Sequence, residues 1–514
     1  MRSPSRSRLL ALALLALVLL PGCGKAPSEP ERSEPARKPN IVVFITDDES
    51  WLERSAYGWS HLPTPNFDRV AREGALFTHA YSSAPSCAPA RASLLTGHNF
   101  WELEQGSFIQ AWLPTKFPVV PDLLAAAGYR VGHTGKGWGP GVYPEGGHGP
   151  DSAGKPYQDI RLGDPQEAIS AVDYTANFEA FLDQTPAEEP FFFWVGLTEP
   201  HAPWAQDNYE KLQQRYGVSL DQVSVPGFLP DTPAIRRQRA NMLYEVCYAD
   251  EQLGKVLKML EERGQLDNTL LIVTGDNGTS FPRSKASLYD WGVHVPLAIR
   301  WPSRAPAGRT IEDFVTFGDL GVTALAAGGA PVPPEMTGRS LVATLESDKS
   351  GLVDPTRDWV VTGLEWHGEF DPVNLSGRMI RDQRYEYIVR YGSTPALKLD
   401  PALRRPDSEY AKLAETANTQ TLLQSFPGRP ELAPLAAAYA GGAAAEELFD
   451  LEKDPWQLHN VADDPAYAEI KTRLQETLRA YQLETGDPRA TGSMEIFDQT
   501  RQFVQERKHN GYPR

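Results

Sequence analysis

Three unbroken apolar runs constrain the fold of this chain more than any other feature. They cover residues 41–46, 191–197 and 270–274, and none of them alternates with polar residues. Such runs are typical of parallel strands that are buried on both faces. Helical patterns lie between them, one from Thr64-Pro65 to Gly74 and a longer one from Thr232-Pro233 to Gly264. This alternation predicts an α/β fold with a mostly parallel central sheet flanked by helices.

The remainder of the chain has a different pattern. Short strand-like pieces occur at residues 359–361 and 385–389, and a late helix is expected from Pro465 to Thr485. We therefore expect a catalytic domain over residues 40–345 and a smaller C-terminal α+β domain with an antiparallel sheet over residues 346–514.

The first 39 residues have the composition of an export segment. A basic start precedes an apolar run at residues 9–20, which is too short to cross a membrane as a helix. The sequence Leu20-Pro21-Gly22-Cys23 resembles a bacterial lipoprotein signal. We predict a signal peptide over residues 1–22, a lipidated Cys23 and a flexible linker over residues 23–39, with a plain secretory signal as the alternative. Both interpretations place the protein outside the cytoplasm, and the lipoprotein would be anchored to a membrane facing the periplasm or the exterior.

The overall charge narrows the class of partners. The chain carries a formal net charge of −17 and has a pI of about 5.1. Nucleic acid is therefore not an expected partner, because phosphate backbones require clustered Lys and Arg. A small anionic substrate remains compatible with this charge, provided that positive side chains gather locally in its pocket.

Polar side chains follow the apolar runs directly. Asp47 and Asp48 come after the first run, Asp276 and Asn277 after the last, and Pro200-His201 just beyond the second. Ligands of open α/β sheets bind at the carboxyl ends of the strands. Oxygen ligands without paired His or Cys favour Ca²⁺ or Mg²⁺. Such residues are also common in loops and helix caps, but two pairs in equivalent positions predict a shared metal site.

The three cysteines have separate surroundings. Cys23 lies in the export segment, and Cys247 falls on the apolar side of the long helical pattern, as expected of a buried packing residue. Cys87 precedes Pro89 at the start of a short helix that Gly97 would end. The amino end of a helix favours an anion, and Arg91 lies one turn further on the same face.

The segment Cys87-Ala88-Pro89-Ala90-Arg91, followed by Leu94-Leu95-Thr96-Gly97, resembles the signature of the sulfatases, which belong to the alkaline phosphatase superfamily. In that family a maturation enzyme oxidises the cysteine to formylglycine. Further segments resemble the family's other motifs, in order along the chain: Asp47-Asp48, Gly135-Lys136, Pro200-His201-Ala202-Pro203, Gly275-Asp276-Asn277-Gly278, Lys285 with Leu288-Tyr289-Asp290-Trp291-Gly292, and Glu447-Leu448-Phe449-Asp450.

The resemblance implies a mechanism and a cofactor. It implies that the hydrated formylglycine derived from Cys87 attacks sulfur and forms a covalent sulfate ester. The implied cofactor is Ca²⁺, with Mg²⁺ as an alternative, and its ligands would be Asp47, Asp48, the modified Cys87, Asp276 and Asn277. The implied catalytic side chains are Arg91, Lys136 and Lys285, which offset the charge of the sulfate, and His201, which protonates the leaving group.

The chain departs from the family pattern at one position. The family usually has a histidine two residues after the first lysine, and here Trp138 stands there. His133 is our candidate for the missing role and for contact with substrate; the alternative is that the site works without this histidine. His367, in Glu365-Trp366-His367 at the start of the second domain, is a second candidate for binding sugar. Each histidine is equally compatible with ordinary packing.

The branch of the family that the chain resembles most is heparan N-sulfatase (sulfamidase). The supporting segments are Pro230-Asp231-Thr232-Pro233-Ala234, Phe281-Pro282, and Thr337-Gly338-Arg339-Ser340-Leu341. The implied substrate is a sulfated sugar, such as the N-sulfoglucosamine of heparan sulfate. Two alternatives stay open: a phosphatase or phosphodiesterase with two zinc ions and a Ser or Thr nucleophile, and an inactive, lipid-anchored glycan-binding protein.

Overall fold

The computed structural model describes residues 37–367, 376–391, 428–432 and 444–510. One compact unit extends from Lys38 to Arg514, and residues 1–37 are a separate unit. The predicted signal peptide, Cys23 and nearly all of the predicted linker lie outside the described residues. Among the helices of the described part, none combines the length and apolarity needed to cross a membrane.

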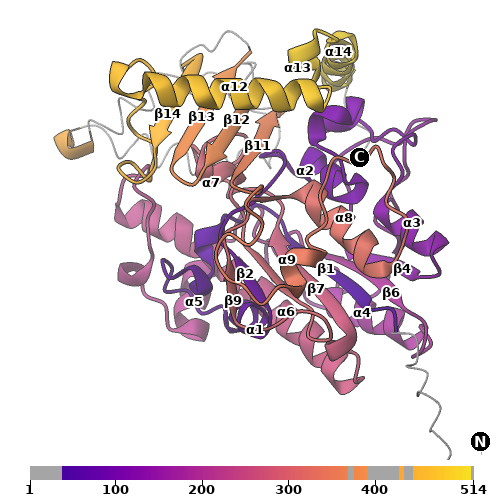
Figure 1. The fold of residues 1–514 in the computed structure, drawn as a ribbon. Helices are drawn as coiled ribbons and strands as arrows, with labels where there is room; N and C mark the ends of the chain where they lie inside the picture. The colour runs from indigo at the N-terminus through magenta and orange to yellow at the C-terminus, as the bar shows by residue number, and fades with distance from the viewer. Residues whose placement is uncertain (1–36, 368–375, 392–427, 433–443, 511–514) are drawn as a thin grey trace, which may run out of the picture. The chain divides into compact units, whose positions relative to one another are not determined.

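The larger sheet has eight strands in the order β5-β4-β6-β1-β7-β8-β2-β9. Neighbouring strands are parallel, except that β8 is antiparallel to both of its neighbours, β7 and β2. Most of these strands are labelled in Figure 1. Its strands are β1 (Asn40–Thr46), β2 (Ala75–Phe77), β4 (Arg130–Gly135), β5 (Lys155–Pro156), β6 (Phe191–Gly196), β7 (Thr269–Gly275), β8 (Leu297–Arg300) and β9 (Arg309–Ile311). Two short strands, β3 (Ala80–Tyr81) and β10 (Val315–Thr316), pair separately.

Helices cover both faces of this sheet, which explains why its central strands have no polar side. Val43 and Ile45 of β1 belong to a core with Leu94, Leu95 and Leu320, whereas Val42 and Phe44 belong to another core with Phe67, Phe178 and Leu257. Burial of each such side chain stabilises the fold by about 1.5–3 kcal/mol. The helices are α1 (Pro65–Glu73), α2 (Cys87–Thr96), α3 (Val120–Ala126), α4 (Tyr174–Asp183), α5 (Asn208–Tyr216), α6 (Pro233–Glu262), α7 (Asp290–Val293), α8 (Phe317–Gly328) and α9 (Val342–Glu346).

The C-terminal part contains a four-stranded antiparallel sheet in the order β11-β12-β13-β14. Helix α12 packs across this sheet, and Leu474 and Leu478 are its buried apolar residues (Figure 1). The elements are β11 (Trp359–Leu364), β12 (Gly377–Asp382), β13 (Tyr385–Arg390), β14 (Glu446–Asp450), α12 (Ala468–Glu484), α13 (Pro488–Thr491) and α14 (Glu495–Asn510).

The predicted fold class is confirmed. All three apolar runs form neighbouring strands, and both helices expected between them are present as α1 and α6, with Pro at the first position of each. The strand β4 was not predicted, because its sequence Arg-Val-Gly-His-Thr-Gly has neither an apolar run nor an alternating pattern. The proposed domain boundary near residue 345 stays a prediction.

Candidate active site

Two adjacent parallel strands bring the first two polar pairs together. β1 and β7 pair with Thr46 opposite Gly275, so that Asp47 and Asp276 follow at the same edge of the sheet. The N–H of Asp276 donates to the carbonyl of Thr46 at 3.1 Å, which continues the ladder to the site itself. The predicted meeting of the two strand ends is therefore confirmed.

Asp48 connects the two strand ends through its main chain and its side chain. Its φ is 65°, in the left-handed region that Asp and Asn tolerate better than most residues. The N–H of Asp48 donates to Oδ1 of Asp276 at 3.0 Å, and Nδ2 of Asn277 donates to Oδ1 of Asp48 at 2.8 Å. These bonds hold three oxygen-bearing side chains in one buried group.

Two lysines face this group. Nζ of Lys136 lies 2.5 Å from Oδ2 of Asp47, and Nζ of Lys285 lies 2.7 Å from Oδ1 of Asp48. Burial lowers the pKa of both lysines, but the neighbouring carboxylates outweigh it and raise the pKa above the ordinary value. Both lysines are therefore cationic at neutral pH.

The helix α2 contributes its amino end to the same place. Cys87 is its first residue and is 2% exposed. Arg91, one turn later, donates from Nε to Oδ2 of Asp276 at 2.8 Å and from Nη1 to the carbonyl of Lys136 at 2.7 Å. Burial, with Asp47 and Asp276, raises the pKa of the Cys87 thiol against the opposing effect of the two lysines.

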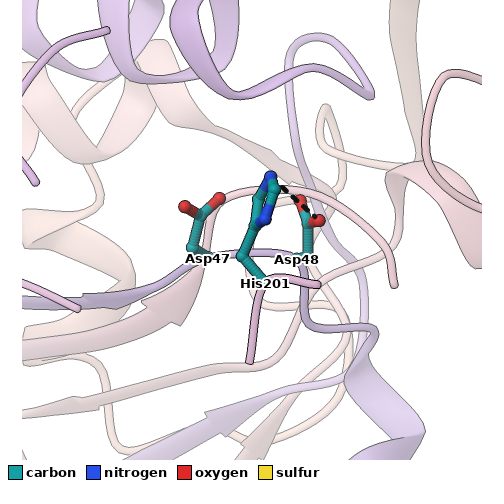
Figure 2. Close-up of side chains that lie close together, drawn as sticks. All are labelled: Asp47, Asp48 and His201. Carbon is teal, nitrogen blue, oxygen red and sulfur yellow. Dashed lines mark ion pairs between the residues drawn. The ribbon is translucent and has the colours of Figure 1, made fainter. Parts of the chain in front are cut away.

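His201 completes the group from beyond the end of β6. Its Nε2 lies 3.6 Å from Oδ2 of Asp48, and Figure 2 shows its ring between the carboxylates of Asp47 and Asp48. Within the described ranges, these three side chains are the group whose ligand atoms all lie within 4.8 Å of one another, as metal ligands do. The predicted ligands Asp276 and Cys87 are not in this group. The oxygens of Asp276 accept hydrogen bonds from Arg91 and from the N–H of Asp48.

Two side-chain oxygens of the site are suited to bind a cation. Oδ1 of Asp47 and Oδ1 of Asn277 are buried and have no hydrogen-bond partner among the residues that the structure describes. A buried polar atom without a partner costs about 1–3 kcal/mol, so such atoms are uncommon unless an ion or water satisfies them. Carboxylate and amide oxygens are the ligands that Ca²⁺ and Mg²⁺ prefer. The residues present therefore fit the predicted cation.

The carboxylates are anionic, as cation ligands must be. Burial opposes the ionisation of Asp47 and Asp48, but Lys136, Lys285 and His201 outweigh it and hold the pKa of both carboxyls below the usual value. Burial and the neighbouring Asp47 instead raise the pKa of Asp276.

The two positions that concern the family's usual histidine, His133 and Trp138, are both buried. His133 is buried in β4, where Nδ1 is 2.8 Å from the carbonyl of Gly154 and Nε2 is 3.3 Å from the amide of Gln158. These contacts are internal, and its substrate role stays a prediction. Trp138 is 4% exposed and packs edge-on against Tyr143, and its buried Nε1 has no hydrogen-bond partner within the described part of the chain.

The structure does bring His367 to the active site. Its Nδ1 lies 2.9 Å from Oγ of Ser86, the residue that precedes Cys87. Residues 281 positions apart in the chain thus meet at the amino end of α2. Its predicted contact with sugar stays a prediction.

Ser280 belongs to the site and was not predicted from the sequence. Its Oγ donates to Oδ2 of Asp48 at 2.5 Å. The signal was weak: a serine in the Gly278-Thr279-Ser280 turn, three residues after Asn277. A hydroxyl so close in sequence to a predicted metal-ligand pair is a reasonable candidate for a supporting hydrogen bond.

Comparison with known proteins decides the family. The family model described as Sulfatase matches residues 39–330, more than half of the chain. The chain belongs to the sulfatase family. A second model, described as N-sulphoglucosamine sulphohydrolase, C-terminal, matches residues 283–426 of this sulfatase. The predicted recognition and enzyme class, sulfuric ester hydrolase, are confirmed.

Relatives of this sulfatase cover nearly its whole length. Human N-sulphoglucosamine sulphohydrolase is 29% identical and covers 88% of this chain and 91% of its own. An ulvan-active sulfatase of Formosa agariphila is 26% identical over 94% of this chain and 82% of its own. Among solved structures, that of BT4656 in complex with its substrate D-glucosamine-2-N,6-O-disulfate has a TM-score of 0.63 at 20% identity, covering 88% of this chain and 99% of that one.

Proposed function

We propose that this sulfatase hydrolyses the sulfate ester or sulfamate of a glycosaminoglycan sugar, with N-sulfoglucosamine as the first candidate substrate. The relative with 29% identity is an N-sulphoglucosamine sulphohydrolase, and the C-terminal family model carries the same description. The solved structure of BT4656 was determined with a glucosamine that carries N- and 6-O-sulfate. These likenesses favour a sulfated glucosamine over other sulfated sugars.

The single observation that carries the proposal is the placement of Cys87. It lies at the amino end of α2, and the charges of Lys136 and Lys285 act on it directly. Arg91 follows one turn later. Free N–H groups, the helix dipole and three cations together make a site for a sulfate group that approaches Cys87.

The residues of the site divide the work of sulfate transfer. Oxidation of Cys87 to formylglycine would supply the hydrated aldehyde that acts as nucleophile. A Ca²⁺ ion held by Asp47, Asp48 and Asn277, and by Asp276 if its side chain shifts, would withdraw charge from the sulfate oxygens.

The protein's own side chains supply the remaining effects. Lys136, Lys285 and Arg91 offset the negative charge of the sulfate during transfer. His201, on the open side of the carboxylates, donates a proton from its imidazole to the departing oxygen or nitrogen. A sulfamate has a particular need of this proton, because an amine anion is a very poor leaving group.

The test combines mass spectrometry and turnover. The protein is produced together with a formylglycine-generating maturation enzyme, and the mass of the peptide that contains Cys87 is measured by mass spectrometry. The matured protein is then assayed on glucosamine carrying sulfate at N, at O6 or at O2. We expect release of sulfate, fastest from the N-sulfated sugar.

Two variants give the controls. Cys87→Ala is expected to abolish turnover, whereas Cys247→Ala, which removes the other buried cysteine of the described chain, is expected to keep it. Activity in Cys87→Ala, or an unmodified thiol in fully active protein, would contradict the mechanism. Faster hydrolysis of phosphate esters with zinc would favour the phosphatase alternative instead.

We also propose that the protein is a lipoprotein anchored through Cys23 outside the cytoplasm. Support comes from the sequence alone, in the segment Leu20-Pro21-Gly22-Cys23. A Cys23→Ala variant is expected to leave the membrane fraction. Equal membrane association of both proteins would rule out the anchor.

A further inference from the structure

The N-cap residue of α2 does not cap its own helix. Ser86 has the extended backbone of an N-cap, with φ −157° and ψ 128°, yet its side chain makes no cap hydrogen bond. A serine in this position ordinarily accepts a hydrogen bond from the second or third N–H of the helix. Here the third residue is Pro89, which has no N–H, so that Ala88 is the one donor that Ser86 Oγ could cap in the usual way.

His367 accounts for the position of the Ser86 hydroxyl. Its Nδ1 lies 2.9 Å from Ser86 Oγ, at hydrogen-bonding distance. The Ser86 hydroxyl thus contacts His367 and makes no cap hydrogen bond to its own helix. The N–H groups of Cys87 and Ala88, at the positive end of the helix dipole, are thereby left without a side-chain cap.

The place of His367 is fixed by buried ion pairs in the C-terminal part. Glu365, two residues earlier, lies 2.8 Å from Nη2 of Arg378 and 2.5 Å from Nη2 of Arg489. Arg378 in turn pairs with Asp487 at 2.7 Å. The charges of this network are mutually compensated, and they anchor Glu365, the residue that follows β11 and lies two positions before His367.

The segment before Cys87 is also held by hydrogen bonds to main-chain carbonyls. Ser82 donates from Oγ to the carbonyl of Asp276 at 2.6 Å, and the N–H of Ala286 donates to the carbonyl of Pro85 at 2.9 Å. The N–H of Gly363 donates to the carbonyl of Ser83 at 3.3 Å. With the backbone fixed on these sides, the freedom left at Ser86 is the rotation of its side chain.

We propose that His367 is a positioning residue of the sulfatase reaction, which keeps the Ser86 hydroxyl off the Ala88 N–H and so leaves the amino end of α2 open to the sulfate group. This inference rests on the proposed function. A hydroxyl in the capping position would occupy the donor that the anion needs. Binding of sulfate at the helix end therefore depends on a residue of the C-terminal part that need not touch the substrate.

The test is a double-mutant cycle at Ser86 and His367. Loss of one hydrogen bond to a charged group weakens binding about 10- to 100-fold. We expect His367→Ala to raise KM and the inhibition constant of free sulfate by about tenfold or more, with a smaller change in kcat. His367→Asn, whose amide replaces Nδ1, is expected to restore most of the affinity.

The double variant gives the decisive comparison. Ser86→Ala has no hydroxyl to compete for the Ala88 N–H, so adding His367→Ala to it should change KM and sulfate inhibition by less than about twofold. A double variant that keeps the full loss would show that His367 acts on the substrate directly, and this would overturn the proposal. Wild-type affinity in His367→Ala would overturn it as well.

Failure of the proposed function is distinguishable from failure of this inference. Affinity for inorganic sulfate is measured by calorimetry on the same four proteins, independently of turnover. If matured wild type hydrolyses none of the sulfated sugars, the proposed function is wrong, and the sulfate affinities still decide the role of His367. Thermal melting of each variant checks that the fold is kept.

Discussion

Arg91 donates from Nε to Oδ2 of Asp276 across 2.8 Å, and neither side chain reaches solvent. The other oxygen of Asp276 accepts from the N–H of Asp48 at 3.0 Å. Asp276 therefore connects the helix that carries Cys87 to the ends of two central strands. This carboxylate therefore helps to fix the position of Cys87 relative to the side chains of Asp47 and Asp48.

Removal of Arg91 is expected to damage both stability and catalysis. Arg91→Ala leaves Asp276 buried without its cation, a change that costs about 3–5 kcal/mol in comparable sites. We expect a clear drop in melting temperature and loss of measurable sulfate release. Calorimetry and a sulfate-release assay measure the two effects.

A surface arginine provides the control for this variant. Arg304 pairs with Glu346 with half of its side chain exposed, and exposed pairs contribute about 0–1 kcal/mol. Arg304→Ala should therefore melt within a few degrees of wild type and keep its activity. Equal melting temperatures for Arg91→Ala and Arg304→Ala would contradict the structural role of Arg91.

Calcium is expected to stabilise the folded protein. A ligand that binds only the native state stabilises it by about 2.7 kcal/mol at a concentration 100 times its Kd. Chelation should therefore lower the melting temperature, and Ca²⁺ should restore it. In Asp47→Asn this response should be much weaker, because the variant has lost an anionic ligand, whereas the exposed Asp231→Asn should respond as wild type does. A calcium response of equal size in all three proteins would place the ion elsewhere.

His201 and Trp138 are expected to differ sharply in their effect on turnover. His201→Ala should lower kcat by about 10²- to 10⁴-fold, the usual contribution of a general acid. Trp138→Phe keeps an aromatic ring and loses an N–H that does not titrate near neutral pH, so kcat should stay within about tenfold of wild type. Pre-steady-state and steady-state assays on the N-sulfated sugar measure both. A comparable loss of kcat in both variants would show that Trp138 also takes part in the proton transfer.

Glu386 is expected to make the protein less stable as the pH rises. Burial raises its pKa to about 8, although Arg381, Gln457 and Arg390 oppose this rise and Glu447 adds to it. Between pH 4.5 and 8 the unfolded chain releases a proton that the folded protein retains. The free energy of unfolding therefore falls with pH in this window, by at most about 1.4 kcal/mol per pH unit.

Glu386→Gln removes this titration. Its unfolding free energy should decline less between pH 5 and 8 than that of wild type, in denaturant titrations at each pH. Parallel pH profiles for the two proteins would show that Glu386 is ionised in the folded state at neutral pH.

Much of the fold could be predicted because the central strands are buried on both faces. The runs that became β1, β6 and β7 have no polar residue to place in solvent, and this pattern is visible in the sequence. β4 lies near one edge of the sheet, and its sequence contains two glycines and a histidine. Its sequence therefore has no strand pattern of its own, and β4 forms because it pairs with β6. Strand pairing of this kind is a property of the assembled sheet.

The candidate site was predictable wherever the functional residue directly follows a strand or begins a helix. Asp47, Asp48, Asp276 and Asn277 meet because parallel neighbours end at one edge, and Cys87 begins α2 because Pro89 favours the first turn. Ser280 was not predicted, because a single serine in a loop belongs to no recognisable sequence motif.

The order of amino acids along the chain determined the candidate site residues and the elements that carry them, since periodicity, caps and motifs are local. Which atoms touch was a matter of the folded protein alone. Arg91 meets Asp276 across 185 positions, and His367 meets Ser86 across 281. A hydrogen bond acts over about 3 Å, so such pairs form only after the packing of helices on sheets has fixed both partners. For that reason the chain predicts a sulfatase site, while the control of its helix end by His367 emerges from the tertiary contacts.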